Sequence, residues 1–327
     1  MRALRIREPN GPAGLELADV AEPVLGPTDL RIRVRASAVN RADLLQTLGR
    51  YPAPPDAPPD IPGLEFAGEI VEVGARARRF TVGARVMGLV GGGAWAEQVV
   101  VNEREAIPVP HALSWEQAGA IPEAFLTAFD AVRLQGGLAP SEWLLIHAVA
   151  SGVGTAAAQL ARAMGAQVIG TARSADKLER VRALGVAHTI HVPQSPPLFA
   201  AEVLEKTGSG AHVALELVGG DYLPQTLAAM APRGRLMVVG TLAGAKARLD
   251  LSVLMRRRLT LTGTVLRTRP LEEKAQLARA FEHELLPMFE RQTVRPLVDA
   301  TYPMQDAAAA LERLSRNESF GKLVLAW

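Results

Sequence analysis

The feature that most constrains this chain is the regular alternation of apolar strand-like runs and helix-like runs from about residue 123 onward. The first unit is a mostly apolar run at residues 143–148, then a loop of small residues and a helical stretch at residues 155–164. A strand, a crossover helix and another strand at this spacing predict an α/β region with a doubly wound parallel sheet. Further strands are expected at residues 167–172, 213–218, 235–240 and 259–264, and a second helix at residues 176–184.

The first 120 residues have a different character, with short strand-like runs separated by turns. Residues 30–36 alternate apolar and polar or small side chains, which is the period of a strand with one buried face. From about residue 296 the chain returns to strand-like sequence. We therefore expect a β-rich domain made of residues 1–122 and 290–327, a nucleotide-binding domain at residues 123–289, and a cleft between the two.

Residues 51–59 are rich in proline and begin with Tyr51. Because proline has a fixed φ and no N–H, this segment cannot form a helix or the interior of a sheet, and it predicts an exposed extended loop. Loops carried by a rigid scaffold often cover functional sites, although a plain linker is the alternative.

The loop between the first strand and helix of the α/β region suits a dinucleotide. A pyrophosphate needs backbone N–H groups at close approach and the N-terminus of a helix. Against the pattern G-x-G-x-x-G, Val149 and Ser151 stand at the first two glycine positions, and only Gly154 matches. The place of this loop inside a strand–helix–strand unit nevertheless predicts a cofactor site. Its expected cofactor-binding residues are Ser151, Gly152, Val153, Gly154 and Thr155.

The end of the next strand distinguishes NAD from NADP. An NAD enzyme places Asp or Glu there to hold the ribose 2′-hydroxyl. Here the strand ends in Arg173 and Ser174, and Lys177 follows one helical turn later. A cation and a hydroxyl suit a 2′-phosphate, so these three residues favour NADPH. A solvent-exposed arginine without a ligand is the alternative explanation of Arg173.

Composition excludes several classes of function. The 327 residues contain 36 Lys and Arg against 34 Asp and Glu, and a formal charge of +2 gives no electrostatic case for nucleic acid. Cysteine is absent, which excludes disulfides, thiolate nucleophiles and Cys-ligated zinc. No signal-peptide segment and no apolar run of ~18 residues is found, so we expect a soluble cytoplasmic protein with no membrane partner.

Several separate segments carry a family resemblance that spans the chain: residues 38–44, 49–51, 62–68, 120–128, 147–159, 239–241 and 321–325. With them the chain resembles the zinc-free quinone oxidoreductases, the zeta-crystallin-like group of the medium-chain dehydrogenase/reductase superfamily. Asn-Arg-Ala-Asp at 40–43 and Ile-Pro-Glu-Ala at 121–124 resemble the branch of NADPH quinone reductases induced by a tumour suppressor in animals. The resemblance implies a GroES-like catalytic domain, a Rossmann domain and a homodimer formed through the sixth strand of the latter.

Zinc-dependent relatives bind their metal with a Cys after an early strand and a His in Gly-His-Glu. Here Asn40 stands at the Cys position and Leu64 at the His position, so the resemblance implies that there is no metal. An alkoxide would then lack electrostatic support, whereas a quinone accepts a hydride readily. The expected reaction is hydride transfer from NADPH to a quinone, with protons from solvent and the protein holding the two reactants face to face. Some family members release semiquinones, which leaves one-electron products open.

The resemblance also assigns roles to individual residues. Tyr51 matches a tyrosine that the family places over the substrate, and Asn40 is expected near the nicotinamide. Asp43 is a proton-relay candidate, with a helix cap or an Arg partner as the alternative, and Glu65 is expected in a structural salt bridge. Val192 stands where close relatives carry a tyrosine near the adenosine phosphate. Further cofactor-binding residues are expected at Thr127, Val239, Gly240, Thr241, Leu266, Arg267, Asn317 and Lys322.

Other functions stay open at this point. An NADPH-dependent enone or enoyl-thioester reductase on the same fold would need a general acid over the α-carbon and a long acyl channel. A nucleotide- or RNA-binding protein without catalysis is the alternative from another class, although 5% aromatic residues and the low net charge offer neither a stacking platform nor a basic groove. A scaffold with a degraded cofactor loop, suggested by Val149, is a third alternative.

Overall fold

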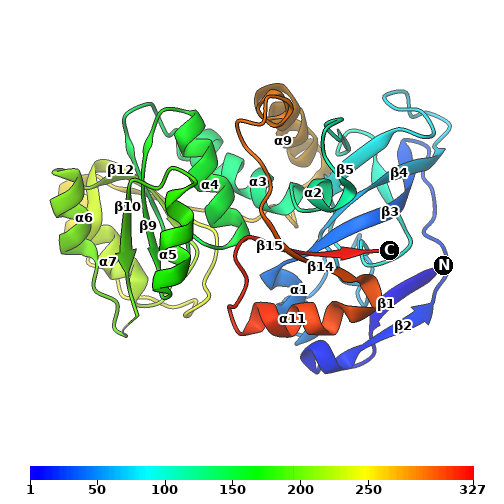
Figure 1. The fold of residues 1–327 in the computed structure, drawn as a ribbon, viewed down its shortest axis with the longest axis horizontal. Helices are drawn as coiled ribbons and strands as arrows, with labels where there is room; N and C mark the ends of the chain where they lie inside the picture. The colour runs from blue at the N-terminus through cyan, green and yellow to red at the C-terminus, as the bar shows by residue number, and fades with distance from the viewer. Residues whose placement is uncertain (194) are drawn as a thin grey trace. The chain divides into compact units, whose positions relative to one another are not determined.

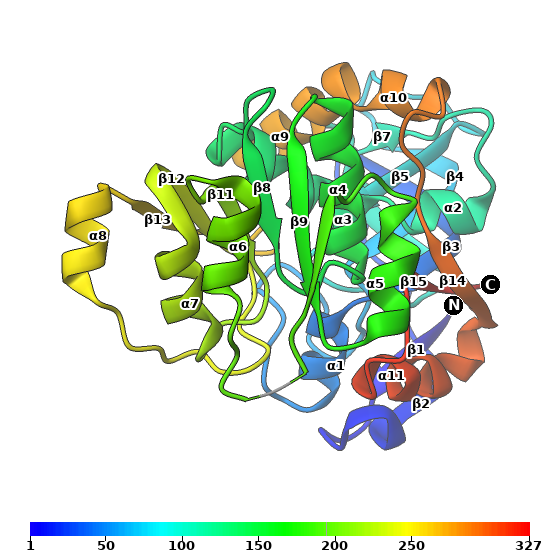
Figure 2. The same ribbon diagram turned by 60° about the vertical axis from the view of Figure 1, so that its left-hand side comes forward.

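The computed structural model describes residues 1–193 and 195–327 (Figure 1; Figure 2). The chain divides into two compact units. The first unit comprises residues 1–126 and 266–327, and the second comprises residues 127–265. The sequence placed these boundaries at 122/123 and 289/290, so the second unit is smaller than expected and residues 266–289 belong to the first.

The second unit is built on a six-stranded parallel sheet with the strand order β10-β9-β8-β11-β12-β13. This is the order 3-2-1-4-5-6 of doubly wound nucleotide-binding folds, and it confirms the predicted fold class. The order reverses between β8 and β11, and in such sheets the loops after these central strands form the ligand-binding edge. The strands are β8 (Trp143–Ile146), β9 (Gln167–Ala172), β10 (His188–His191), β11 (Ala211–Glu216), β12 (Met230–Val238) and β13 (Thr260–Gly263).

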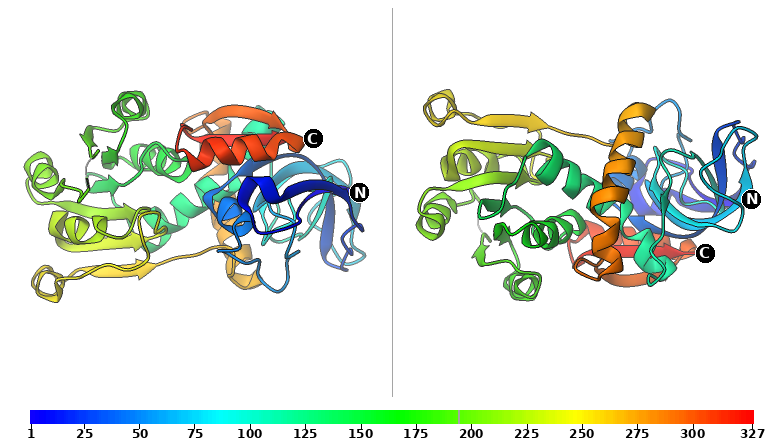
Figure 3. Two further views of the ribbon diagram at one scale, coloured as in Figure 1. Left: turned by 90° about the horizontal axis from the view of Figure 1, so that it is seen from below. Right: turned by 90° about the horizontal axis from the view of Figure 1, so that it is seen from above.

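Helices cover both faces of the parallel sheet. The helices α4 (Gly152–Ala163) and α5 (Ala175–Arg182) pack against β9, whereas α6 (Ala200–Thr207) and α7 (Tyr222–Ala229) pack on each other and against β11. Figure 3 shows these two pairs on opposite faces. The core of the sheet is therefore mainly apolar, and Leu145, Ile169 and Leu236 are fully buried between the helix layers. The remaining elements are the π-helical segment η2 (Phe129–Gln135) and α8 (Leu251–Arg257).

The first unit contains a seven-stranded sheet with the order β14-β15-β3-β4-β5-β7, in which β6 also pairs with β3. The tail strand β15 pairs antiparallel with β3 in a register that sets Leu323 opposite Val39. This confirms that the tail rejoins the N-terminal region, and it brings Lys322 beside the end of β3. The strands are β3 (Asp29–Val39), β4 (Glu65–Val73), β5 (Arg85–Leu89), β6 (Gln98–Asn102), β7 (Ile107–Pro108), β14 (Val298–Pro303) and β15 (Lys322–Ala326), besides the separate pair β1 (Arg2–Ile6) and β2 (Leu15–Asp19).

The helices α9 (Leu271–Glu284) and α10 (Leu286–Glu290) belong to the first unit because their apolar faces are buried there. The ring of Phe289 meets Phe125 edge-on with the centroids 4.9 Å apart, and Arg279 donates to the carbonyl oxygen of Ala106 at 2.8 Å. A helical pattern alone could not reveal which sheet these helices cover, which explains the misplaced boundary. Other helical elements are η1 (Gly11–Gly14), α1 (Arg41–Thr47), α2 (Trp115–Gly119), α3 (Pro122–Ala128), η3 (Met304–Asp306) and α11 (Ala307–Ser315).

The two ends of the chain meet in the first unit. The guanidinium of Arg2 lies 5.3 Å from the ring centroid of Trp327, and Figure 1 shows both termini beside each other. Within the described residues, no helix has both the length and the apolar character needed to cross a membrane.

Candidate active site

The predicted phosphate loop joins β8 to α4 in the second unit. Ser151 is the N-cap of α4, and its Oγ accepts the N–H of Gly154 at 3.1 Å. The hydroxyl of Thr155 donates to the carbonyl oxygen of Gly152 at 3.0 Å, which tightens the first turn. A helix N-terminus built this way directs its remaining N–H groups and the positive end of the helix dipole at one point, which suits a phosphate.

Close backbone packing explains which glycines this loop keeps. A Cβ on Gly154 would lie 2.6 Å from the carbonyl oxygen of Ala148, so only glycine fits there. Val149, at the first glycine position of the pattern, is fully buried, and a Cβ on Gly170 would lie 2.7 Å from its Cγ1. The glycine in β9 thus makes room for the valine, and the substitution leaves the loop intact.

The end of β9 presents the predicted specificity residues. Arg173 is exposed, and its carbonyl oxygen is hydrogen-bonded to the ring of His191 at 2.9 Å. Ser174 caps α5 by accepting the N–H of Lys177 at 3.3 Å, which gives Ser174 a structural role as well. Val192 is buried in the core and cannot contact a cofactor from the surface.

The sequence did not point to Tyr222, the first residue of α7, whose phenol interacts electrostatically with Arg173. Burial raises the pKa of the Tyr222 phenol above its ordinary value, and the positive charge of Arg173 partly opposes that rise. The two side chains therefore share one electrostatic environment. Only the fold could reveal that this aromatic ring and the predicted specificity residue Arg173 affect each other, because Tyr222 follows Arg173 by 49 positions in the chain.

Glu216, the last residue of β11, anchors two loops at the ligand-binding edge. Its Oε1 accepts the N–H groups of Val218 at 2.8 Å and Gly219 at 2.9 Å. Its backbone oxygen accepts the N–H groups of Val239 at 2.9 Å and Gly240 at 3.1 Å, which follow β12. Val239, Gly240 and the exposed Thr241 therefore lie at the edge where the sequence placed them.

A fully buried polar network underlies this edge. The two ring nitrogens of His147 are hydrogen-bonded to the hydroxyls of Thr171 at 2.8 Å and Thr226 at 2.9 Å. The Thr226 hydroxyl also bonds Oε2 of Glu216 at 3.0 Å. Burial lowers the pKa of His147 below its ordinary value, although Glu216 opposes that shift. The imidazole is therefore neutral and ties the ends of β8, β9 and β11 together.

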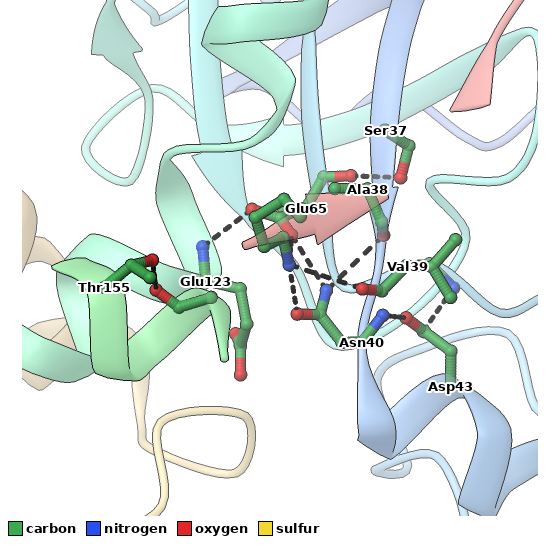
Figure 4. Close-up of polar contacts among 11 residues, drawn as sticks. Ser37, Ala38, Val39, Asn40, Asp43, Glu65, Glu123 and Thr155 are labelled. Atoms are coloured by element: carbon green, nitrogen blue, oxygen red, sulfur yellow. Dashed lines mark hydrogen bonds and ion pairs between the residues drawn. The ribbon is translucent and has the colours of Figure 1, made fainter. Parts of the chain in front are cut away.

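In the first unit, Asn40, Glu65 and Lys322 form a second buried polar cluster (Figure 4). The Lys322 ammonium lies 2.7 Å from Oε1 of Glu65 and also donates to Oδ1 of Asn40. The Asn40 amide donates to the same Glu65 oxygen at 2.8 Å. This confirms that Glu65 makes a structural salt bridge. It also gives Lys322, expected to bind the cofactor, a buried partner inside the protein.

Asp43 is held by backbone N–H groups at the start of α1. It completes a capping box, with Oδ2 accepting the N–H of Asn40 at 2.8 Å, while Oδ1 accepts the N–H of Gly63 at 3.0 Å. The helix-cap alternative for Asp43 is confirmed. Burial raises the pKa of Asp43 to about 6, although both hydrogen bonds favour the charged form.

Glu123, near the start of α3, is a residue that sequence reasoning did not assign. Its backbone N–H donates to Oε2 of Glu65 at 2.8 Å, which places it against the buried cluster. Burial is the main cause that raises the pKa of its carboxyl to about 8. The negative charges of Glu65 and Asp43 also raise this pKa, and the positive charges of Lys322 and Arg267 lower it by less. Glu123 is therefore protonated at neutral pH.

Tyr51 and Arg267 meet in the same unit. The Arg267 guanidinium lies 5.1 Å from the Tyr51 ring centroid and donates to the carbonyl oxygens of Tyr51 and Pro52 at 3.4 Å. Its other nitrogens donate to the carbonyl oxygen of Gly91 at 2.7 Å and to Oε1 of Gln46 at 2.5 Å. All three guanidinium nitrogens thus have protein acceptors. Arg267, expected to bind the cofactor, anchors the proline-rich loop of residues 51–59, which has no helix or strand, as predicted.

Three other residues that were expected to bind the cofactor are hydrogen-bonded to, or covered by, other parts of the protein. Asn317 has a positive φ of 56° just after α11, where Asn is favoured, and its Oδ1 accepts a hydrogen bond from Arg41 at 2.8 Å. Leu266 is 5% exposed and Thr127 is 6% exposed, so both are largely covered. The expected site residues are accordingly divided between the two units. Glu123, Glu216 and Tyr222 are residues beside them that the sequence did not point to.

The fold and these two groups of residues define the class of dehydrogenases that combine a GroES-like domain with a Rossmann domain. Two family models match: the alcohol dehydrogenase GroES-like domain over residues 26–111 and the zinc-binding dehydrogenase family over residues 152–282. The first match lies inside the first unit, and most of the second match lies in the second unit.

The chain belongs to the quinone oxidoreductase family of the medium-chain dehydrogenase/reductase superfamily. It is 34% identical to a quinone oxidoreductase of Pseudomonas aeruginosa over 96% of both chains. Among solved structures, it is similar to a quinone oxidoreductase of Pseudomonas syringae (TM-score 0.88, 31% identity, covering 100% of this chain and 99% of that one). It is also similar to the Escherichia coli quinone oxidoreductase complexed with NADPH (TM-score 0.88, 26% identity, 100% of both chains). The narrower resemblance to the tumour-suppressor-inducible branch stays a prediction.

The residues of this chain do not fit the zinc ion that one family model's description implies. The chain has no cysteine, and Asn40 and Glu65 already share the positive charge of Lys322. Among the described residues, no group of three or more His, Asp or Glu side chains is arranged to hold a metal. Zinc prefers Cys, His and carboxylate ligands that are free to bind it. The donor set around Asn40 therefore does not suit a catalytic zinc ion.

Proposed function

We propose that this enzyme reduces quinones with NADPH. The proposal rests on two features that this fold combines: the capped N-terminus of α4 and the exposed Arg173 at the end of β9. The first suits a pyrophosphate, and the second suits the 2′-phosphate that distinguishes NADPH from NADH. The kinship with quinone oxidoreductases supports the choice of acceptor.

The cofactor would be held by the residues of the second unit. The N-terminus of α4, with Ser151 and the close approach at Gly154, fits the pyrophosphate. Arg173, Ser174 and Lys177 would hold the 2′-phosphate, and Thr127, Val239, Gly240 and Thr241 are proposed for the nicotinamide half. When bound, NADPH supplies a hydride. The protein orients the reactants and excludes water.

A quinone would lie against the first unit near Tyr51. The Tyr51 ring is half-buried and is fixed from one side by Arg267, so it offers a flat surface of defined orientation. The Asn40 amide, held by Glu65, stays a candidate polar contact for the substrate. A conjugated diketone needs no metal to accept a hydride, which agrees with the donor set around Asn40.

We further propose a homodimer joined through β13, and a cytoplasmic location where NADPH is available. The strand β13 lies at the edge of the parallel sheet and leaves one side open to another strand. Apolar side chains nearby are exposed: Leu251 by 62%, Met255 by 74% and Val265 by 50%. A second copy adding its own β13 would cover both features in one symmetric contact. Light scattering should then give twice the 34.8 kDa of one chain.

The test is a fluorescence titration of the purified protein with NADPH and with NADH. We expect NADPH to bind at least ten-fold more tightly, and Arg173→Ala to remove most of that preference. Arg182→Ala, a change of an exposed arginine at the C-terminal end of α5, serves as the control. Turnover is compared for 1,4-benzoquinone and for 2-cyclohexenone. Faster turnover of the enone would favour the enone reductase alternative, and NADPH binding without turnover of either acceptor would favour a non-catalytic protein.

A further inference from the structure

The environment of Glu123 differs from that of each other carboxyl in its cluster. Both oxygens of Asp43 accept backbone N–H groups, and Glu65 accepts from Asn40, Lys322 and the backbone of Glu123 itself. The Glu123 carboxyl has no hydrogen bond to any described residue. Figure 4 shows it pointing away from the contact between its own N–H and Glu65. The Glu123 carboxyl is thus the one in this cluster for which these contacts indicate no structural role.

The charges that face Glu123 favour a proton on it. Asp43 and Glu65 are acidic neighbours, and Lys322 and Arg267 are basic ones. The ammonium of Lys322 is already neutralised by Glu65, and the guanidinium of Arg267 is bonded to carbonyl oxygens and to Gln46. Glu123 is half-buried, so water only partly compensates for a negative charge there. A proton is retained on its carboxyl near neutral pH.

Glu123 and Tyr51 share one electrostatic environment. The negative charge of Glu123 contributes to raising the pKa of the Tyr51 phenol, whose main cause is burial, while Arg267 acts in the opposite direction. The carboxyl therefore lies near the ring that is proposed to contact the substrate. A protonated acid beside a substrate surface is the arrangement that general acid catalysis requires.

We propose that Glu123 is the general acid that protonates the quinone oxygen during reduction. The quinone gains a hydride from the reduced cofactor, and its developing oxyanion takes the proton from the Glu123 carboxyl. The O–H bond of the acid breaks and the O–H bond of the hydroquinone forms. One hydride and one proton balance the conversion of quinone to hydroquinone, and Glu123 is left as a carboxylate that water reprotonates. This inference rests on the proposed quinone reduction, and it replaces solvent as the direct proton source.

Both carboxylate oxygens of Asp43 already accept backbone N–H groups, so we assign the donor role to Glu123 instead. The pKa of about 6 for Asp43 leaves it charged at neutral pH, and its two backbone hydrogen bonds are made to the charged form. Asp43 thus fixes the start of α1, and the expectation of a proton relay passes to Glu123.

The test compares Glu123→Gln with the wild type in three measurements. The variant should lower kcat for 1,4-benzoquinone by about 10²–10⁴-fold while changing the NADPH Kd less than three-fold. The wild-type kcat should fall as the pH rises through about 8, and the variant should lack that fall. Infrared difference spectra of the protein alone should show a protonated carboxyl band that titrates near pH 8 and is missing in the variant.

Glu105→Gln provides the matched control, because Glu105 is also a poorly exposed carboxyl of the first unit, but it lies 3.7 Å from the ammonium of Lys274. The charges that shift the pKa of Tyr51 are those of Arg267 and Glu123 and not that of Glu105. That variant should keep both the quinone rate and the infrared band. A Glu123→Gln enzyme that retains the rate and the alkaline fall would overturn the inference and leave quinone reduction standing. Wild-type protein that binds NADPH but reduces no quinone would overturn both.

Discussion

The ammonium of Lys322 lies 2.7 Å from a carboxylate oxygen of Glu65, 257 residues earlier in the chain, and both side chains are buried. The contact exists because β15 pairs with β3 and β3 pairs with β4, which carries the two residues into one layer. The Asn40 side chain is hydrogen-bonded to both groups: it accepts from the Lys322 ammonium and donates to the Glu65 carboxylate. The pair therefore fastens the tail of the chain to the sheet beside Asn40, at the start of α1.

Breaking this pair from one side should destabilise the protein strongly. Lys322→Met leaves the Glu65 carboxylate buried without its counter-charge, which costs about 3–5 kcal/mol of unfolding free energy. The double variant Lys322→Met with Glu65→Gln should recover much of that loss, because no uncompensated charge remains. Urea denaturation at pH 7 measures all three proteins. Arg316→Met, which removes a cation from an exposed ion pair, should change stability by less than about 1 kcal/mol. A single variant as stable as that control would contradict the account.

Protonation of Glu123 in the folded state should make stability depend on pH. Its carboxyl has an ordinary pKa of 4.5 in the unfolded chain and a pKa of about 8 in the fold. Between these values the folded protein binds the extra proton, so the unfolding free energy falls as pH rises, by at most about 1.4 kcal/mol per pH unit. Asp43 adds a fall of the same sign between its ordinary value of 3.8 and about pH 6.

Comparing the wild type with Glu123→Gln isolates the first contribution, since Asp43 titrates in both proteins. Chemical denaturation at pH 5, 6.5 and 8 should show that the variant gains stability relative to the wild type as the pH increases. Parallel stability profiles for the two proteins would mean that Glu123 is already ionised in the fold at pH 5.

The parts of this fold that local pattern encodes were predictable from the sequence. The strands β8, β9, β11, β12 and β13 follow from short apolar runs between helical segments, and the helix start at Ser151 follows from a capping residue before a run of small side chains. The short strand β10, with the sequence His-Thr-Ile-His, has no such apolar run. The boundary near residue 266 was not predictable, because a helix pattern does not say which sheet buries its apolar face. The burial of Phe281 and Phe289 in the first unit decides that question only in three dimensions.

The residues of the candidate site also fall into those that local sequence can predict and those that depend on the fold. The sequence pattern predicted a phosphate loop and a role for Arg173, since both predictions depend only on neighbouring residues. It could not assign Glu123 or the anchoring role of Arg267, because each depends on partners brought together by long-range strand pairing. Glu123 meets Glu65 across 58 residues, and Arg267 meets Gln46 across 221. A side chain's ionisation and its available donors are properties of such contacts and not of the local sequence.

Glu216 should act on cofactor binding through the loops that it holds. In Glu216→Gln the amide nitrogen that replaces one oxygen cannot accept a hydrogen bond. Either the N–H groups of Val218 and Gly219 lose their acceptor, or the hydroxyl of Thr226 keeps only the carbonyl oxygen of Tyr222 as an acceptor. In both cases a buried hydrogen bond to a charged group is lost, and we expect the unfolding free energy to fall by about 1.5–3 kcal/mol. The loosened loop should weaken NADPH binding about ten-fold in a fluorescence titration, with the preference over NADH unchanged because Arg173 is untouched. Glu179→Gln on the exposed face of α5 is the control and should bind NADPH like the wild type. A folded Glu216→Gln protein with wild-type NADPH affinity would show that the loop keeps its conformation without this carboxylate.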